Sequence, residues 1–215
     1  KIGIKIKIEI SIDIKIIRRI LNYSIVIGLA SVGHFLYSRV DILILGQYGY
    51  IKEISYYEFA FKILTILTIP YGIISQVISP SITQHQTNKN FKIIYIKFKK
   101  YLLVSLVSSI LLTILILIGY PIFINYYSAY NTDLMQTTLY LMLPVYLFEL
   151  INGIIPTGFV IATGHAKLST YFLVIFGIVN TVLDLTFIHL FGYLGVVLAT
   201  LITRVVTDIV FIYLY

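Results

Sequence analysis

Long stretches without a charged side chain constrain this chain more than any other feature of its sequence. Residues 63–88 and 101–119 contain no Asp, Glu, Lys or Arg. Crossing the hydrocarbon core of a bilayer takes about 20 apolar residues in a helix. Lipid offers no hydrogen bonds to the backbone, so a spanning segment must satisfy its own polar groups, as a helix does. These stretches therefore predict transmembrane helices.

Composition supports the same interpretation and excludes several functions. Hydrophobic residues make up 59% of the 215 residues and charged ones only 12%, whereas soluble domains are roughly a quarter charged. The absence of cysteine excludes disulfides, thiolate metal sites and cysteine nucleophiles. The net charge of +7 could favour nucleic acid, but the basic residues lie mainly in short stretches between apolar runs. Membrane lipids and topology explain that placement better, so we expect no nucleic-acid partner.

We predict an all-α, polytopic transmembrane helix bundle of about six spans. A lead segment, residues 1–19, precedes the bundle, residues 20–215. Isoleucine alternates with polar residues in much of the lead, which is typical of a strand, but a lone strand needs a partner and its conformation stays open. The predicted spans are 20–45, 56–82, 101–119, 134–162, 168–190 and 195–215.

Basic residues predict the orientation, since cytoplasmic loops accumulate Lys and Arg. Lys52 is the only basic residue in the loops that would face the other side. Both termini are therefore predicted to be cytoplasmic, in a cell membrane protein. The chain starts without Met, and we expect it to be part of a longer protein. The basic residues on the predicted cytoplasmic side are Lys1, Lys5, Lys7, Lys15, Arg18, Arg19, Lys89, Lys92, Lys97, Lys99, Lys100 and Lys167.

Prolines and small residues inside the predicted spans have two possible uses. Each proline removes a backbone donor and tends to kink its helix, which either helps the bundle pack or shapes a cavity. Gly192, Gly195 and Ala199 form a small-residue face that favours close helix packing. The prolines are Pro70, Pro80, Pro144 and Pro156.

Ionisable residues inside the spans are the best pointers to function, because a charge in hydrocarbon is costly. Two pairs are spaced four residues apart, Glu58 with Lys62 and Arg204 with Asp208. Each pair can neutralise itself on one helix face or meet other helices. Glu149 has no such neighbour, so it must face the bundle interior, find a cation or carry a proton. The remaining members are Arg39 and Asp41, expected to point to different faces, Asp184 and, more weakly, His34.

Enzyme signatures are missing from the sequence. The histidines His34, His85, His165 and His189 are scattered without ligand spacing. Neither a phosphate-binding loop with its Gly-Lys-Ser/Thr end nor a Gly-x-Ser-x-Gly elbow is present. We therefore expect no enzyme, no ATP-driven pump, no cofactor and no metal site.

Four segments and one single residue carry a family resemblance. They are Asp41-Ile-Leu-Ile-Leu-Gly46, Ile54-Ser-Tyr-Tyr-Glu-Phe-Ala-Phe-Lys62, Ile161-Ala-Thr-Gly-His-Ala-Lys167, Asn180 and Phe191-Gly-Tyr-Leu-Gly-Val-Val-Leu-Ala199. These residues resemble one family of membrane transporters, the Wzx-type polysaccharide flippases. That family belongs to the superfamily that also holds the multidrug and toxin extruders and the lipid II flippases. The resemblance covers nearly the whole chain after about residue 20 and is to the C-terminal half of a twelve- or fourteen-helix transporter.

The resemblance implies one lobe of a two-lobed transporter that passes a polyprenyl-diphosphate-linked oligosaccharide outward for polysaccharide biosynthesis. The N-terminal half of the same transporter is then the expected partner. Arginine suits a diphosphate because it forms paired hydrogen bonds to phosphate oxygens. Substrate contact is assigned on this basis to Arg39 and Arg204. Glu149 is assigned to the same set, although it could instead couple transport to protons or sodium, and ion coupling is assigned to Asp41, Asp184 and Asp208.

Two other functions stay open at this level. A multidrug extruder of the same superfamily would exchange organic cations for ions and favour an acidic, aromatic cavity, whereas a flippase of sugar phosphates favours a basic one. A non-transporting membrane assembly subunit would have a filled bundle without a polar cleft.

Overall fold

The computed structural model describes residues 14–126 and 132–214. Within these ranges the chain folds into helices and contains no strand, which confirms the predicted all-α class. The lead segment of residues 1–13, whose conformation the sequence left open, lies outside the described residues. The elements are α1 (Ile14–Ser38), α2 (Val40–Gln47), α3 (Ile51–Thr87), α4 (Phe91–Tyr126), α5 (Asp133–Asn152), the π-helix η2 (Pro156–Ile161), α6 (Ala166–Phe191) and α7 (Tyr193–Leu214).

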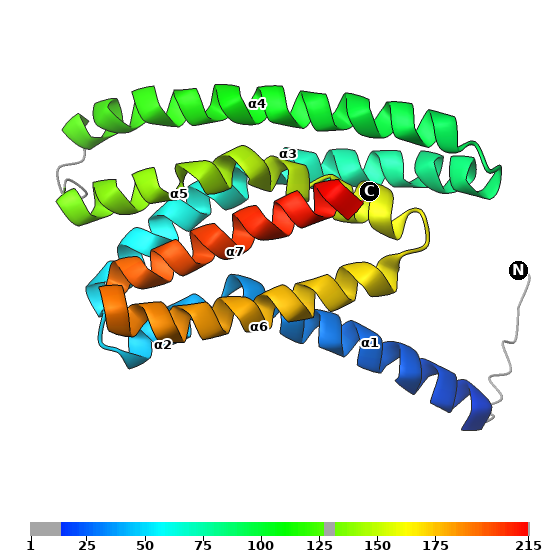
Figure 1. Ribbon diagram of the computed structural model, residues 1–215, viewed down its shortest axis with the longest axis horizontal. Coiled ribbons are helices and arrows are strands. Elements are labelled where there is room, and N and C mark those ends of the chain that lie inside the picture. The colour runs from blue at the N-terminus through cyan, green and yellow to red at the C-terminus, as the bar shows by residue number, and fades with distance from the viewer. Residues whose placement is uncertain (1–13, 127–131, 215) are drawn as a thin grey trace, which may run out of the picture.

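The long helices lie side by side, with α4 and α1 on opposite outer sides of the bundle (Figure 1). Helix α7 is central and packs against both α5 and α6, while α1 packs mainly on α6. The α2–α3 turn and the α6–α7 turn lie at one end of the bundle, and the α3–α4 turn and the η2–α6 loop lie at the other (Figure 1). The chain thus runs back and forth along one direction, as membrane crossings require.

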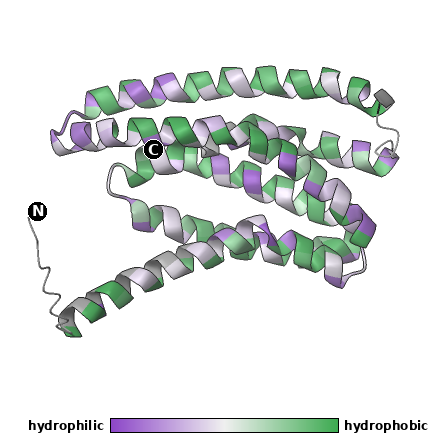
Figure 2. Ribbon diagram, turned by 180° about the vertical axis from the view of Figure 1, so that it is seen from behind, coloured by the Kyte–Doolittle hydropathy of each residue, from purple (hydrophilic) through white to green (hydrophobic). Residues whose placement is uncertain are grey.

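Within residues 14–126 and 132–214, four helical segments are long and apolar enough to cross a membrane, by length and composition. Their outward side chains are largely exposed isoleucine, leucine and valine, such as Val77 and Leu190 at 73% and 70% exposure, which suits a lipid-facing surface. Hydrophilic residues gather on α3 and α4 near the turn that joins them (Figure 2). The count of six spans stays a prediction. The four segments are Ile51–Thr87, Phe91–Ile124, Ala166–Phe191 and Tyr193–Tyr213.

Two of the predicted spans are not single α-helices. The first, predicted over 20–45, is interrupted at Arg39, where φ of −141° leaves the helical region between α1 and α2. The fourth, predicted over 134–162, stops being regular α-helix after Asn152 and continues as the π-helix η2. Gly153 is a poor helix former, and Pro156 lacks the N–H that a continuous helix would use. Hydrophobicity alone did not reveal either interruption.

Helix α4 is longer than its predicted span of 101–119, because it begins at Phe91. The basic stretch of residues 89–100 is therefore mostly helical rather than a loop. Ile94 and Phe98, four residues apart, are buried on the inner face, so the helical period continues through the lysines. Lys97 reaches α3, where its Nζ donates a hydrogen bond to Ser81 Oγ at 2.6 Å.

Close packing at the small-residue positions of α7 confirms the prediction made for them. A Cβ on Gly195 would lie 2.1 Å from the carbonyl oxygen of Phe187 in α6, and Gly192 adopts φ of 61° in the turn between the helices. Only glycine tolerates both situations well. The α6–α7 turn is thereby held tight, which places the polar face of α7 against its neighbours.

Candidate functional site

Two aspartates of the predicted ion-coupling set meet in the bundle interior. Asn180 on α6 joins them, because its Nδ2 donates to Asp41 Oδ1 at 2.8 Å and to Asp184 Oδ2 at 2.9 Å. The second oxygen of Asp41 accepts a hydrogen bond from the hydroxyl of Tyr57 on α3. Thr200 on α7 lies within 3.0 Å of that hydroxyl. We call Asp41, Tyr57, Asn180, Asp184 and Thr200 the carboxylate cluster.

The carboxylate cluster is sealed from solvent and rich in oxygen atoms. Asp41 and Asp184 are 0% exposed, and Asp184 Oδ1 has no hydrogen-bond partner within the described residues. Two neighbouring carboxylates in a dry interior repel each other unless a positive charge or proton accompanies them. Carboxylate, amide and hydroxyl oxygens are ligands suited to a small hard cation. The cluster is thus able to hold a proton or a small cation. Among the described residues, no three His, Cys, Asp or Glu side chains form a metal-binding group.

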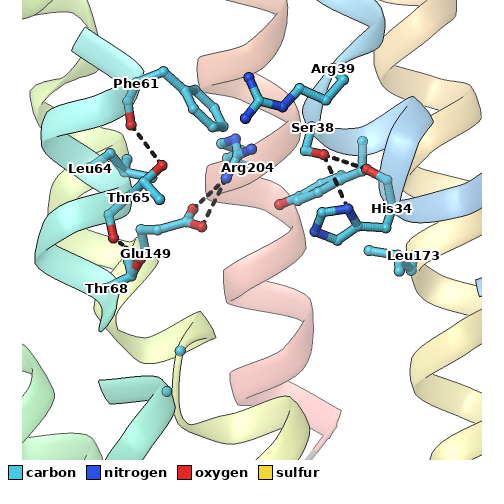
Figure 3. A pocket seen from close by; sticks show the side chains of 13 residues that line it. His34, Ser38, Arg39, Phe61, Leu64, Thr65, Thr68, Glu149, Leu173 and Arg204 are labelled. Atoms are coloured by element: carbon cyan, nitrogen blue, oxygen red, sulfur yellow. Dashed lines mark hydrogen bonds and ion pairs between the residues drawn. The ribbon is translucent and has the colours of Figure 1, made fainter. Parts of the chain in front are cut away.

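A cavity of about 400 Å³ lies beside the cluster, between α1, α3, α5, α6 and α7. Arg204 and Glu149 both line this cavity, and their side chains point toward each other (Figure 3). Arg204 Nη1 donates to both carboxylate oxygens of Glu149 at 2.8 Å. The guanidinium lies 4.8 Å and 4.6 Å from the ring centres of Tyr37 and Phe61, a favourable arrangement for a cation. Other lining residues are His34, Ser38, Arg39, Leu64, Thr65, Thr68, Gly72, Gly153 and Leu173.

Ion pairing across helices replaces the pairing within helices that sequence spacing allowed. Glu58 accepts a hydrogen bond from Arg39 Nη1 at 2.9 Å rather than pairing with Lys62. Arg204 pairs with Glu149 on α5 rather than with Asp208 on its own helix. The Arg39 side chain is 51% exposed, whereas that of Arg204 is 4% exposed. The first pair therefore borders open space and the second belongs to the interior.

Asp208 does not join the other two aspartates of its predicted set. It lies one turn beyond Arg204 on α7 and is 1% exposed, and it makes no hydrogen bond to the carboxylate cluster within the described ranges. For the substrate-contact set, the structure brings Arg39, Arg204 and Glu149 to one cavity. The functional roles of all six residues stay proposals.

Several residues of the carboxylate cluster and of the Arg204 surroundings were not assigned a role from sequence. Tyr57 and Thr200 supply hydroxyls to Asp41, and Tyr37 and Phe61 supply rings around Arg204. Asn180 and Asp184 are four residues apart and share one face of α6, so their spacing could have identified that pair. No local signal marks the aromatic residues, because Tyr and Phe recur throughout this sequence.

Comparison with known families identifies the chain at the level of a transporter family. The model of the MatE family matches residues 26–186, which is well over half of the chain. No curated protein and no solved structure gives a match. The matched region includes the break at Arg39, the Asp41–Asn180–Asp184 contacts and Glu149. The chain therefore belongs to the MatE family, whose members are membrane transporters of the multidrug/oligosaccharidyl-lipid/polysaccharide exporter superfamily.

Proposed function

We propose that this chain is one lobe of an ion-coupled exporter that flips a polyprenyl-diphosphate-linked oligosaccharide across the cytoplasmic membrane. The observation that carries the proposal is the cavity lined by Arg39 and Arg204. A diphosphate that crosses a membrane needs cationic donors where water is scarce, and arginine offers planar paired donors. Arg204 Nε has no partner in the described part of the chain, so its guanidinium has a donor left for a phosphate oxygen.

Coupling to an ion is assigned to the carboxylate cluster. A cation or proton bound there would relieve the repulsion between the carboxylates of Asp41 and Asp184, which reach the cluster from α2 and α6. Because Thr200 and Arg204 are both on α7, one turn apart, a change at the cluster acts on the helix that also carries the cavity arginine. The other half of the transporter would complete the pathway between the two lobes.

A second candidate, the export of organic cations in exchange for ions, is favoured by one specific observation. The cavity also contains the Glu149 carboxylate, with the rings of Phe61 and Tyr37 beside it. Acidic and aromatic groups together recognise organic cations. Since MatE members are transporters, the non-transporting assembly subunit receives no support from the family.

The substrate is tested with the full-length transporter in liposomes, with a fluorescent polyprenyl-diphosphate disaccharide or ethidium as substrate. Arg39→Gln should reduce flipping of the diphosphate about tenfold through loss of a charged hydrogen bond, while Lys62→Gln, an exposed neighbour, should not. Ethidium transport that depends on Glu149, together with absent diphosphate flipping, would instead establish the cation extruder.

Ion coupling is tested with imposed gradients of Na⁺ or of pH. Asp41→Asn should abolish the dependence of transport on the gradient, because the cluster loses the charge that attracts the cation. Asp133→Asn is the matched control, since Asp133 is exposed at the start of α5. Gradient-driven transport that survives Asp41→Asn would refute the assigned coupling site.

Orientation is proposed from the lysines near the α3–α4 turn and the η2–α6 loop, which should face the cytoplasm. The chain has no cysteine of its own, so single cysteines report the topology directly. Asn90→Cys, at the α3–α4 turn, and Gln47→Cys, at the end of α2, should react with an impermeant maleimide from opposite sides of the membrane. Reaction of both from one side would reject the topology.

A further inference from the structure

Asp208 is a buried acid to which the structure gives no compensating contact. It is 1% exposed on α7, and neither of its carboxylate oxygens has a hydrogen-bond partner in the described part of the chain. An ionised carboxylate left alone inside a membrane protein is costly, so such groups pair with something or carry a proton. The contacts that the structure gives Asp208 do not meet this requirement.

The charged groups around Asp208 come from two helices and leave one negative charge uncompensated. Arg204 on α7 and Glu149 on α5 both interact electrostatically with it. Arg204 already gives Nη1 to both oxygens of Glu149, so one guanidinium faces two carboxylates. The third neighbour, Tyr37 on α1, is 6% exposed and interacts electrostatically with Asp208. Its hydroxyl also lacks a hydrogen-bond partner among the described residues.

We propose that Asp208 is the carboxylate of a second cation site, separate from the carboxylate cluster, which takes a monovalent cation, either a proton or Na⁺. The inference rests on the proposed ion-coupled export. Asp208 contributes two buried oxygen atoms that have no hydrogen-bond partner among the described residues, and the missing positive charge equals one monovalent cation. A cation bound at the carboxylate cluster would not serve Asp208. The hydrogen bonds of the cluster connect Asp41 with Asp184 and reach neither Asp208 nor Tyr37.

Occupancy of this second site would act on the cavity through Arg204. While a cation neutralises Asp208, Glu149 is the only carboxylate that competes for the guanidinium, and the observed pair is stable. When the cation leaves, Asp208 competes with Glu149 for Arg204. Both members of the observed pair line the cavity, so the groups presented to the substrate depend on whether the second site is filled.

Cation stoichiometry in the purified full-length transporter tests the inference. Binding of ²²Na⁺ at equilibrium forms one arm, and proton release after an alkaline pH step in weak buffer forms the other. Asp208→Asn should bind one cation fewer than wild type, and the Asp41→Asn/Asp208→Asn variant one fewer again. Asp133→Asn, with its exposed carboxylate, should match wild type.

The outcomes separate this site from the proposed function. An unchanged stoichiometry in Asp208→Asn in both arms would overturn the second site, whereas an unchanged stoichiometry in Asp41→Asn would overturn only the first. Should Asp208→Asn fail to fold, wild-type protein can be modified with dicyclohexylcarbodiimide, which attacks protonated carboxyls in apolar surroundings. Modification of Asp208 that falls with Na⁺ or with rising pH supports the site and identifies the ion. Modification that responds to neither rejects it.

Discussion

The two polar regions of this bundle differ in how completely their groups are paired. In the carboxylate cluster, hydrogen bonds between side chains connect residues from four helices, and only one oxygen, Asp184 Oδ1, is left over among the described residues. Around Arg204, in the same part of the chain, the Asp208 oxygens, the Tyr37 hydroxyl and Arg204 Nε are all unpaired. The cluster is preorganised for one small ligand, whereas the Arg204 region can exchange partners.

The contrast between the two polar regions is tested most strongly by removing Glu149, the acid that is hydrogen-bonded to Arg204. Glu149→Gln removes the hydrogen-bonded carboxylate partner of the buried Arg204 guanidinium. It should destabilise the protein by about 3 kcal/mol, measured by thermal unfolding in detergent, and should abolish transport.

Glu58→Gln is the matched control for that substitution. It removes the partner of Arg39, whose side chain is 51% exposed, and exposed ion pairs contribute about 0–1 kcal/mol. Equal destabilisation by the two substitutions would mean that the Arg204–Glu149 pair is also effectively solvated, and the contrast between interior and border pairs would be lost.

Double-mutant cycles measure whether Arg204 is coupled energetically to Glu149 or to Asp208. The cycle of Arg204→Ala with Glu149→Ala should give an interaction energy in the range of about 0.5–3 kcal/mol, as for residues in contact. The cycle with Asp208→Ala should give a smaller value when the second cation is bound. Unfolding midpoints at fixed Na⁺ concentration and pH provide the measurement.

Transport by the Arg204→Ala/Asp208→Ala variant separates a structural from a substrate role for the arginine. If Arg204 contacts the diphosphate, this variant should stay inactive while still reaching the membrane, and Arg204→Lys should be weakened through loss of the paired donors. A fully active double variant would discard substrate contact.

The smallest expected effect concerns a single hydroxyl of the carboxylate cluster. Tyr57→Phe removes a donor to Asp41 and should lower cation affinity about tenfold, as for a group that orients a ligand. Tyr146→Phe removes a hydroxyl bonded to the Ala60 carbonyl and should cost similar stability, about 1 kcal/mol, without changing cation affinity. Equal affinity losses would show that the Tyr57 effect is general to the bundle.

The sequence by itself determined that the chain is a helical membrane protein, and it singled out the charged residues that lie within the predicted spans. Both conclusions depend on local quantities: the length of an apolar run against bilayer thickness, and the cost of a charge in lipid. Their spacing of two residues predicted that Arg39 and Asp41 point to different faces. They have different partners, Glu58 for Arg39, and Tyr57 and Asn180 for Asp41. Which half of a transporter the chain represents stays a prediction.

Only the tertiary structure decided which partners these charges have. Arg204 has Asp208 four residues away, yet it pairs with Glu149, 55 residues earlier in the chain. Spacing along a helix specifies which side chains share a face, but the rotation of each helix against its neighbours specifies which face meets which. That rotation is set by close contacts such as Gly195 against Phe187 and by the interruption at Arg39. The small-residue face was visible in the sequence, but which neighbouring helix it meets depends on the packing of the whole bundle.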